Sequence, residues 1–230
     1  GVNRKFLNFR QGDTHLNNVR NQLTKKQVKI WEYFVPRKLI ELHYAVNHEH
    51  PNKPLDRIYF DIDRKDIPAE KAQLVAYSLI KTIQEDNTFP VSSTIFPLWT
   101  GNSFHVYIIL KKKVPHSFYD KYIHTEHNQS QTFTSRWTKK IQGQLPNIPI
   151  VAGHEKQEGM INIDPSQSPS GKIGRSPFSL YMKTYSSIHG AALPLTIDDL
   201  KLKNLVSQLR AYTIEKVIKN IDTLAKKLPL

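Results

Sequence analysis

The sequence predicts an α+β (α/β) fold built around one main sheet, and three observations support this prediction. Short runs in which apolar and polar residues alternate, typical of strands with one buried face, occur at 57–63, within 92–110 and at 160–164. Apolar residues at helical spacing lie between these runs. The 230 residues, 39% hydrophobic and 23% charged, suffice for one large domain or two small ones with a proper core. Strands that alternate with helices favour such a layered sandwich.

The N-terminal part of the chain is expected to be helical. Thr24 and Gln27 have the spacing of a capping box, and apolar residues recur at helical spacing until Pro36, which ends the helix. A second helix is expected over 37–46. The segment 47–54 is rich in His, Asn and Pro, so we predict a loop there.

The middle of the chain predicts a strand, a helix and a hairpin. The strand at 57–63 is followed by a helix with Asp66 at its N-cap and Pro68 in its first turn. Residues 92–110 are predicted to form two strands that turn at 100–102, where the sequence is Thr-Gly-Asn.

Beyond the hairpin, the pattern predicts a polar helix, two short strands and a helical end. The helix is expected within 115–144, and the strands at 160–164 and 178–183 are separated by a loop at 165–176. The last helical stretch is expected to start at the capping pair Thr196 and Asp199 and to break near Thr213 on its way to Leu230.

The composition limits the partners and the compartment. With 33 Lys and Arg against 20 Asp and Glu, the net charge is +13, which favours a polyanionic partner, nucleic acid before membrane. The absence of cysteine excludes disulfides and thiolate zinc sites. No apolar run approaches the roughly 20 residues that span a bilayer, and no secretory signal opens the chain, so we expect a cytoplasmic protein without a membrane partner.

The segment Ile58-Tyr59-Phe60-Asp61-Ile62-Asp63 carries the first chemical signal. Successive side chains of a strand point to opposite faces, so the apolar ones face a core while Asp61 and Asp63 share the other face. Two close carboxylates repel each other unless a cation or a proton intervenes. Such oxygen ligands suit Mg²⁺ or Mn²⁺, with phosphate oxygens completing the shell. The alternative is a pair of solvated acids at an exposed strand end.

Two further strands follow the same face pattern. Ser103 and His105 share a polar face and are suited to donate hydrogen bonds to phosphate oxygens. Asn162 and Asp164 share the polar face of the strand at 161–164. Adjacent strands would therefore bring the three acids, Ser103 and His105 to one surface.

The loop at 171–176 adds glycines and two cations after the third acid. Lys172 and Arg175 are candidate triphosphate or template contacts, although basic glycine-containing loops are also common surface turns. Four aromatic residues are candidates for base stacking, but core packing is the commoner fate of such side chains: Trp99, Tyr107, Trp137 and Tyr181. The histidines at 48–50 and 124–127 are expected to be surface residues rather than metal ligands.

Three ordered motifs resemble those of the archaeo-eukaryotic primase superfamily. They are Asp61-Ile62-Asp63, Ser103-Phe104-His105, and Asp164 with Arg175-Ser176-Pro177-Phe178. The stretch that follows is similar to the polymerase domain of the bacterial end-joining ligase D family, and it reads Pro177-Phe178-Ser179-Leu180, Gly190-Ala191-Ala192-Leu193-Pro194-Leu195 and Asp198-Asp199. The resemblance covers 55–200. The chain departs from it in having no cysteine zinc module and only Thr100-Gly101-Asn102 as a lead-in to the second motif.

The resemblance implies a primase-polymerase fold with a catalytic sheet like that of RNA-recognition motifs, flanked by helices. The catalytic domain would be 1–200, with an N-terminal α/β layer at 1–54 and a motif-bearing core at 55–200, and 201–230 would be a C-terminal helical extension.

It also implies a template-dependent nucleotidyltransferase, a DNA primase or polymerase. We expect the protein to be cytoplasmic and nucleoid-associated, and of prokaryotic, archaeal or mobile-element origin. Asp61, Asp63 and Asp164 would hold two Mg²⁺ or Mn²⁺ ions, and no zinc is expected. The phosphates of an NTP or dNTP would contact Ser103, His105, Lys172, Arg175 and Lys183. Single-stranded or primed template DNA would be the partner, together with other domains or subunits of a longer replication, repair or defence protein.

Other functions remain open from the residues alone. A metal-dependent nuclease would use the same acids and basic surface but leaves Ser103 and His105 unexplained. A non-catalytic nucleic-acid-binding subunit of the same fold would not need the acids. A glycosyltransferase with an Asp-x-Asp site gives the surplus of positive charge no role.

Overall fold

The structure is a computed structural model that describes residues 43–125, 131–155, 157–184 and 187–229, with only the backbone described at 182–184, 187 and 188. The expected helix at 24–36 and most of the expected N-terminal layer lie outside these residues. None of the helices in the described ranges is long and apolar enough to cross a membrane.

A six-stranded sheet forms the centre of the molecule, in the order β10-β3-β4-β2-β6-β5. Its strands are β2 (Leu55–Asp63), β3 (Ser93–Trp99), β4 (Phe104–Val114), β5 (Ile150–Ala152), β6 (Ile161–Asp164) and β10 (Leu193–Pro194). Neighbouring strands are antiparallel, except for the parallel pair β5 and β6. The predicted strand at 57–63, the hairpin and the strand at 160–164 are therefore confirmed.

Two helices connect the strands and give the sheet its topology. Helix α3 (Ala69–Glu85) joins β2 to β3, and α4 (Phe133–Gln144) lies between β4 and β6. The order β3-β4-β2-β6 is that of a split βαβ fold, as in RNA-recognition motifs. This confirms the expected α+β class.

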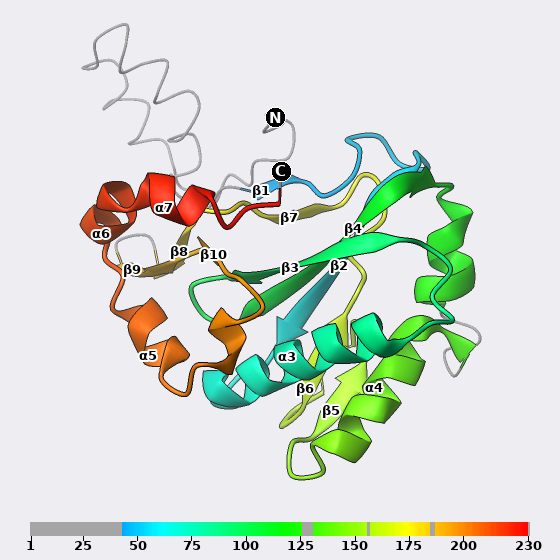
Figure 1. The fold of residues 1–230 in the computed structure, drawn as a ribbon, viewed down its shortest axis with the longest axis horizontal. Helices are drawn as coiled ribbons and strands as arrows, with labels where there is room; N and C mark the ends of the chain where they lie inside the picture. Colours follow the sequence, from blue (N-terminus) through cyan, green and yellow to red (C-terminus); the bar gives the residue numbers. More distant parts are fainter. Residues whose placement is uncertain (1–42, 126–130, 156, 185–186, 230) are drawn as a thin grey trace, which may run out of the picture.

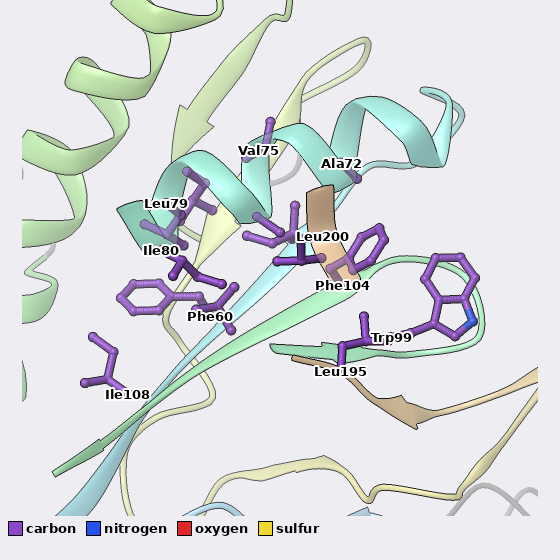
Figure 2. Packing of buried hydrophobic residues seen from close by; sticks show 14 of the residues in the cluster. Phe60, Ala72, Val75, Leu79, Ile80, Trp99, Phe104, Ile108, Leu195 and Leu200 are labelled. Carbon is purple, nitrogen blue, oxygen red and sulfur yellow. The ribbon is translucent and has the colours of Figure 1, made fainter. Parts of the chain in front are cut away.

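Helices α3 and α4 cover one face of the sheet (Figure 1). The apolar face of β2 predicted from its alternation, Ile58, Phe60 and Ile62, is fully buried there. The buried side of α3 packs on this face, with Ile80 next to Phe60 of β2 (Figure 2). The helix spacing and the strand alternation thus bury two matching stripes against each other.

The opposite face carries a smaller second core. Strands β1 (His43–Ala45) and β7 (Ile173–Arg175) pair antiparallel on this side of the sheet (Figure 1). The buried members of this core are Val46, Tyr59, Phe96, Leu98, Tyr107 and Ala192. One half of this face is therefore closed, and the end of the sheet that carries Asp61 and Asp63 is the half that keeps accessible polar side chains.

The remaining elements are short. A π-helix, η3 (Tyr119–Ile123), precedes α4, and β8 (Leu180–Thr184) pairs with β9 (Ser187–Ala191). The described chain then continues through η5 (Asp199–Lys201), α5 (Leu205–Arg210), α6 (Ile214–Lys219) and α7 (Ile221–Ala225). The Thr196 and Asp199 pair exchanges side-chain to backbone hydrogen bonds, and Thr213 is the N-cap of α6, so both signals are confirmed. The domain boundary at residue 200 stays a prediction.

Some predictions were wrong. Residues 43–45 form a strand rather than the end of a helix, because they pair with β7, which itself lies in the expected loop. Helix α3 begins at Ala69, not at Asp66, because 64–67 form a separate turn in which the Ile67 N–H donates to the Arg64 carbonyl. Strands β5, β9 and β10 were missed.

Candidate active site

Asp61 lies between two polar partners on the neighbouring strands. In the register of the sheet, Asp61 is directly opposite His105 on β4 and directly opposite Asp164 on β6. Directly opposed side chains point to the same face of a sheet. The strands that the sequence left unconnected are thus adjacent, and they place Asp61, His105 and Asp164 in one row. Asp63 lies two residues further along β2, opposite Asn162.

The opposed carboxylates form an electrostatically unfavourable pair. Opposed Cα atoms in antiparallel strands are about 4.5–5.5 Å apart, so Asp61 and Asp164 are close like charges. About a third of the Asp61 side chain (38%) is exposed. A cation bound between two such carboxylates would relieve their repulsion.

The carboxylates are oxygen ligands of the kind that hard divalent cations take. One Asp164 oxygen accepts a hydrogen bond from the Ser166 N–H (2.8 Å) and one Asp63 oxygen accepts from the Lys65 N–H (3.3 Å). These backbone hydrogen bonds help to orient the two carboxylates. In the part of the chain that the structure describes, no group of three or more His, Cys, Asp or Glu side chains is placed so that it could hold a metal ion by itself. An open site completed by phosphate and water oxygens is what Mg²⁺ or Mn²⁺ prefers.

The ring of His105 packs against Tyr59 and contacts its hydroxyl. The Tyr59 hydroxyl lies 3.0 Å from Nε2 and 3.1 Å from Nδ1 of His105, and the two rings pack edge to face with centroids 4.7 Å apart. Nε2 also lies 3.5 Å from Oδ1 of Asp61. Burial, and then the positive charge of Arg175 and the proximity of His43, lower the pKa of His105 well below its usual value. His105 is therefore neutral at neutral pH and has one acceptor nitrogen and one N–H.

Tyr59 stays protonated throughout the physiological range. Burial raises its pKa well above the usual value, and the negative charge of Asp61 raises it further. Tyr59 is thus a permanent hydroxyl beneath the row, on the same face as Asp61.

Ser103 joins the β3–β4 turn to β2. Its buried hydroxyl donates to the Ile62 carbonyl, and its N–H donates to the Thr100 hydroxyl (2.9 Å). Arg64 braces the same turn, because its guanidinium donates to the backbone carbonyl (2.8 Å) and the side-chain oxygen (2.7 Å) of Asn102. The hydroxyl that was expected to contact phosphate therefore contacts β2 in this structure.

The shortened lead-in to this strand has a defined conformation. Gly101 has a φ of +94°, and a Cβ there would lie 2.4 Å from Cβ of Tyr181, so only glycine fits. The turn is thus packed directly against the β8–β9 hairpin.

The three expected basic contacts differ in position. Arg175 lies on β7, donates to the Leu180 carbonyl (2.9 Å) and has its guanidinium 5.4 Å above the Tyr181 ring. It is close enough to His105 to lower that residue's pKa. Lys172 is exposed in the turn before β7. Lys183 lies on β8, and its side chain is outside the part that the structure describes.

Two residues that sequence reasoning missed support β2. The Ser168 hydroxyl accepts from the Tyr59 N–H and donates to the Tyr59 carbonyl, each at 2.9 Å. Asn47 does the same for Arg57, accepting from its N–H (2.8 Å) and donating to its carbonyl (2.9 Å). These side chains continue the hydrogen bonding of β2 beyond the point where β6 ends. Neither carries a sequence signal, because the partners are distant along the chain.

The aromatic candidates have the expected core role. Trp99, Tyr107 and Trp137 are at most 2% exposed, which confirms core packing, while Tyr181 is half-buried beneath Arg175. His48 and His50 are exposed on a loop, as expected.

The comparisons with known proteins give a similarity at the level of the fold. No protein-family model and no curated protein sequence matches the chain. Among solved structures, the fold is similar to that of the polymerase domain of Ligase D from Mycobacterium tuberculosis, determined in complex with DNA. The TM-score is 0.53 and the sequence identity 15%, over 86% of this chain and 67% of that chain. At this identity the similarity shows the fold, and it confirms the expected primase-polymerase fold.

Proposed function

We propose that the chain is a template-dependent nucleotidyltransferase, a DNA primase or polymerase that adds nucleotides from NTPs or dNTPs to a 3′-hydroxyl. The observation that carries this proposal is the row of Asp164, Asp61 and His105 across three neighbouring strands, with Asp63 beside it. The shared fold with a polymerase domain supports the same reaction class.

The acids supply the charge that this reaction requires. Asp61, Asp63 and Asp164 would hold two Mg²⁺ or Mn²⁺ ions, which when bound activate the 3′-hydroxyl and neutralise charge on the phosphates. Tyr59 fixes the ring of His105, so that its imidazole can donate to a phosphate oxygen. Because the imidazole is neutral, it does not repel the cations.

The surrounding cations would bind the rest of the substrate. We assign the triphosphate to Arg175, Lys172 and Lys183, together with Ser103 and His105. The Ser103 hydroxyl donates to the Ile62 carbonyl, so it can reach a phosphate only through a bridging water or after giving up this hydrogen bond. The net charge of +13 favours single-stranded or primed template DNA as the partner.

A nuclease is the second candidate, because opposed carboxylates and a basic surface serve strand cleavage as well. The two functions predict opposite changes in strand length. The protein is incubated with a labelled primer on a template, Mg²⁺ or Mn²⁺ and nucleotides, and a parallel reaction lacks the primer. We expect longer products, lost in Asp61→Asn and kept in the exposed-acid control Asp66→Asn. Shortened strands without extension would reject the polymerase and establish the nuclease.

A further inference from the structure

A cavity of about 300 Å³ lies between the β8–β9 hairpin and the loop that joins α5 to α6. These elements lie side by side at one end of the molecule (Figure 1). Leu180 and Ile214 give the cavity apolar walls, Tyr212 gives it an aromatic ring, and Arg210 gives it a positive charge. None of these residues takes part in the row of acids.

The cavity adjoins the turn that leads to Ser103. Gly190 forms part of its wall, and a Cβ at Gly190 would lie 3.0 Å from the carbonyl oxygen of Gly101. Arg210 extends towards the first turn of α3, where its Nη1 atom lies 4.0 Å from Oε1 of Glu70. The cavity therefore adjoins the β3–β4 turn, which Arg64 and Ser103 connect to the end of β2.

Positive charge converges at the mouth of this cavity. The ammonium group of Lys216 lies 3.2 Å from the carbonyl oxygen of Ala211, the residue between Arg210 and Tyr212. Arg64 lies close to Arg210. The pKa of Arg64 is lowered first by burial and next by the positive charge of Arg210. The three cations outnumber the two carboxylates nearby, Glu70 and the cavity-lining Glu215, and this net positive charge favours an anion.

The combination matches a nucleotide. An aromatic ring and apolar walls stack on a base, which is sequence-tolerant because every base has a π-face, and neighbouring cations bind the phosphate. The volume is at the small end of small-molecule sites, as expected for one nucleotide.

The charge of the surrounding segment indicates a strand rather than a free nucleotide. Residues 201–230 contain seven Lys and Arg and two Asp and Glu. Lys203 and Lys219 are exposed on either side of the cavity-forming loop along the chain. A backbone with one phosphate per nucleotide can use these additional cations, whereas a single nucleotide cannot.

We propose that this cavity binds one nucleotide of a single nucleic-acid strand, with the base on Tyr212 and the adjacent phosphate between Arg210 and Lys216. The proposal rests on the proposed function, because it places the strand next to the turn that leads to Ser103. It assigns to the C-terminal helices a direct role in holding the strand.

Binding measured without chemistry tests the proposal. A short fluorescein-labelled oligodeoxythymidylate is titrated with the full chain in EDTA, and anisotropy gives the Kd over a range of salt concentrations. Tyr212→Ala is expected to raise the Kd roughly tenfold through lost stacking, and Tyr212→Phe to restore it. Arg210→Gln is expected to reduce the magnitude of the log–log salt slope by about 0.7, the value for one phosphate contact on a single strand. Tyr77→Ala, at another half-buried tyrosine on α3, is the matched control and should bind like the wild type.

The outcomes separate this proposal from the proposed function. Unchanged affinity and salt slope in Arg210→Gln, an exposed position whose substitution leaves the core intact, would overturn it even if Tyr212→Ala fails to fold. It would also be overturned if thymidine monophosphate binds in a Tyr212-dependent way while the oligonucleotide ignores Tyr212, because the site would then hold a free nucleotide. If strand binding depends on Tyr212 but the wild-type protein synthesises nothing, the cavity binds a strand and the polymerase proposal is rejected. If the wild-type protein synthesises strands but Tyr212→Ala and Arg210→Gln bind the oligonucleotide as it does, the polymerase proposal stands and the cavity proposal is rejected.

Discussion

At the scale of single residues, the candidate site is defined by what lies on either side of Asp61. A directly opposed pair of like charges destabilises a sheet by roughly 0.2–1 kcal/mol. The use that we propose for this pair is cation binding. The alternation of polar and apolar residues predicts which face carries the acids, since that depends only on local backbone geometry.

Removing one of these charges should stabilise the metal-free protein. Asp164→Asn keeps an oxygen that can accept from the Ser166 N–H but ends the repulsion with Asp61. We expect the melting temperature in EDTA to rise by about 1–3 °C. Differential scanning calorimetry measures this, with Asp66→Asn as the exposed-acid control. A lower melting temperature for Asp164→Asn than for the control would show that the carboxylates do not repel each other.

The hydroxyl of Tyr59 should contribute to stability through His105. Tyr59→Phe keeps the ring packing but leaves a buried imidazole nitrogen without its partner. We expect the free energy of unfolding in urea to fall by about 1–3 kcal/mol. Tyr77→Phe, at a half-buried position on α3, should change it by less than about 0.5 kcal/mol. Equal effects of the two substitutions would contradict the hydrogen bond.

Side-chain partners were much less predictable than side-chain faces. The phosphate contact expected of His105 stays a prediction, but its partner Tyr59 was not expected, because nothing in the sequence relates the two residues. Ser103 and Arg175 likewise contact backbone carbonyls supplied by other elements. Such contacts depend on how distant loops pack, so no spacing in the sequence encodes them.

At the scale of elements, the position of β2 depends on side chains that replace missing strand neighbours. Asn47 bonds both backbone groups of Arg57, and its oxygen also accepts from the Asp56 N–H (2.7 Å). Asn47→Ala should therefore lower the free energy of unfolding by about 1–3 kcal/mol, measured in urea. Asn87→Ala, at an exposed loop position, should have little effect. A small effect at Asn47 would mean that water replaces its hydrogen bonds.

The link between α3 and α4 should be sensitive to acid. Burial alone would raise the pKa of Asp86, but hydrogen bonds from Thr88 and from the Trp137 indole (2.8 Å), together with the charge of Arg136, outweigh it and lower the pKa. A depressed folded pKa gives stability that is present above the unfolded value and is lost as pH falls through the folded one.

We therefore expect the wild type to lose stability below about pH 4 more steeply than Asp86→Asn. Tryptophan fluorescence during acid titration measures the two curves. Parallel curves would show that the carboxylate of Asp86 contributes nothing in its ionised form.

Long elements were predictable and short ones were not. Strands β2 and β4 and helix α3 are long enough to show several periods of their apolar pattern. Strands β1, β5 and β7 have three residues each, which is too short for any periodicity, and each exists because a partner strand pairs with it. The misplaced start of α3 has a similar cause, since Arg64 organises the preceding turn through contacts with Asn102.

At the scale of the whole molecule, the charge is distributed unevenly. Residues 1–42 contain nine Lys and Arg against three Asp and Glu, and 201–230 contain seven against two. The intervening 43–200, which carry the acids of the site, are close to balance with 17 against 15. The composition predicted a nucleic-acid partner, but the ends of the chain, rather than the motif-bearing core, carry most of the surplus charge.

The central claim is that the opposed carboxylates form a divalent-cation site, and Mn²⁺ binding tests it most directly. Electron paramagnetic resonance reports the free Mn²⁺ in titrations of the wild type, Asp61→Asn and the control Asp66→Asn. We predict that Asp61→Asn weakens binding by roughly tenfold or more, while Asp66→Asn binds like the wild type. Equal Mn²⁺ affinity in the wild type and Asp61→Asn would contradict the claim, and the row of acids would then lose its role in nucleotide transfer.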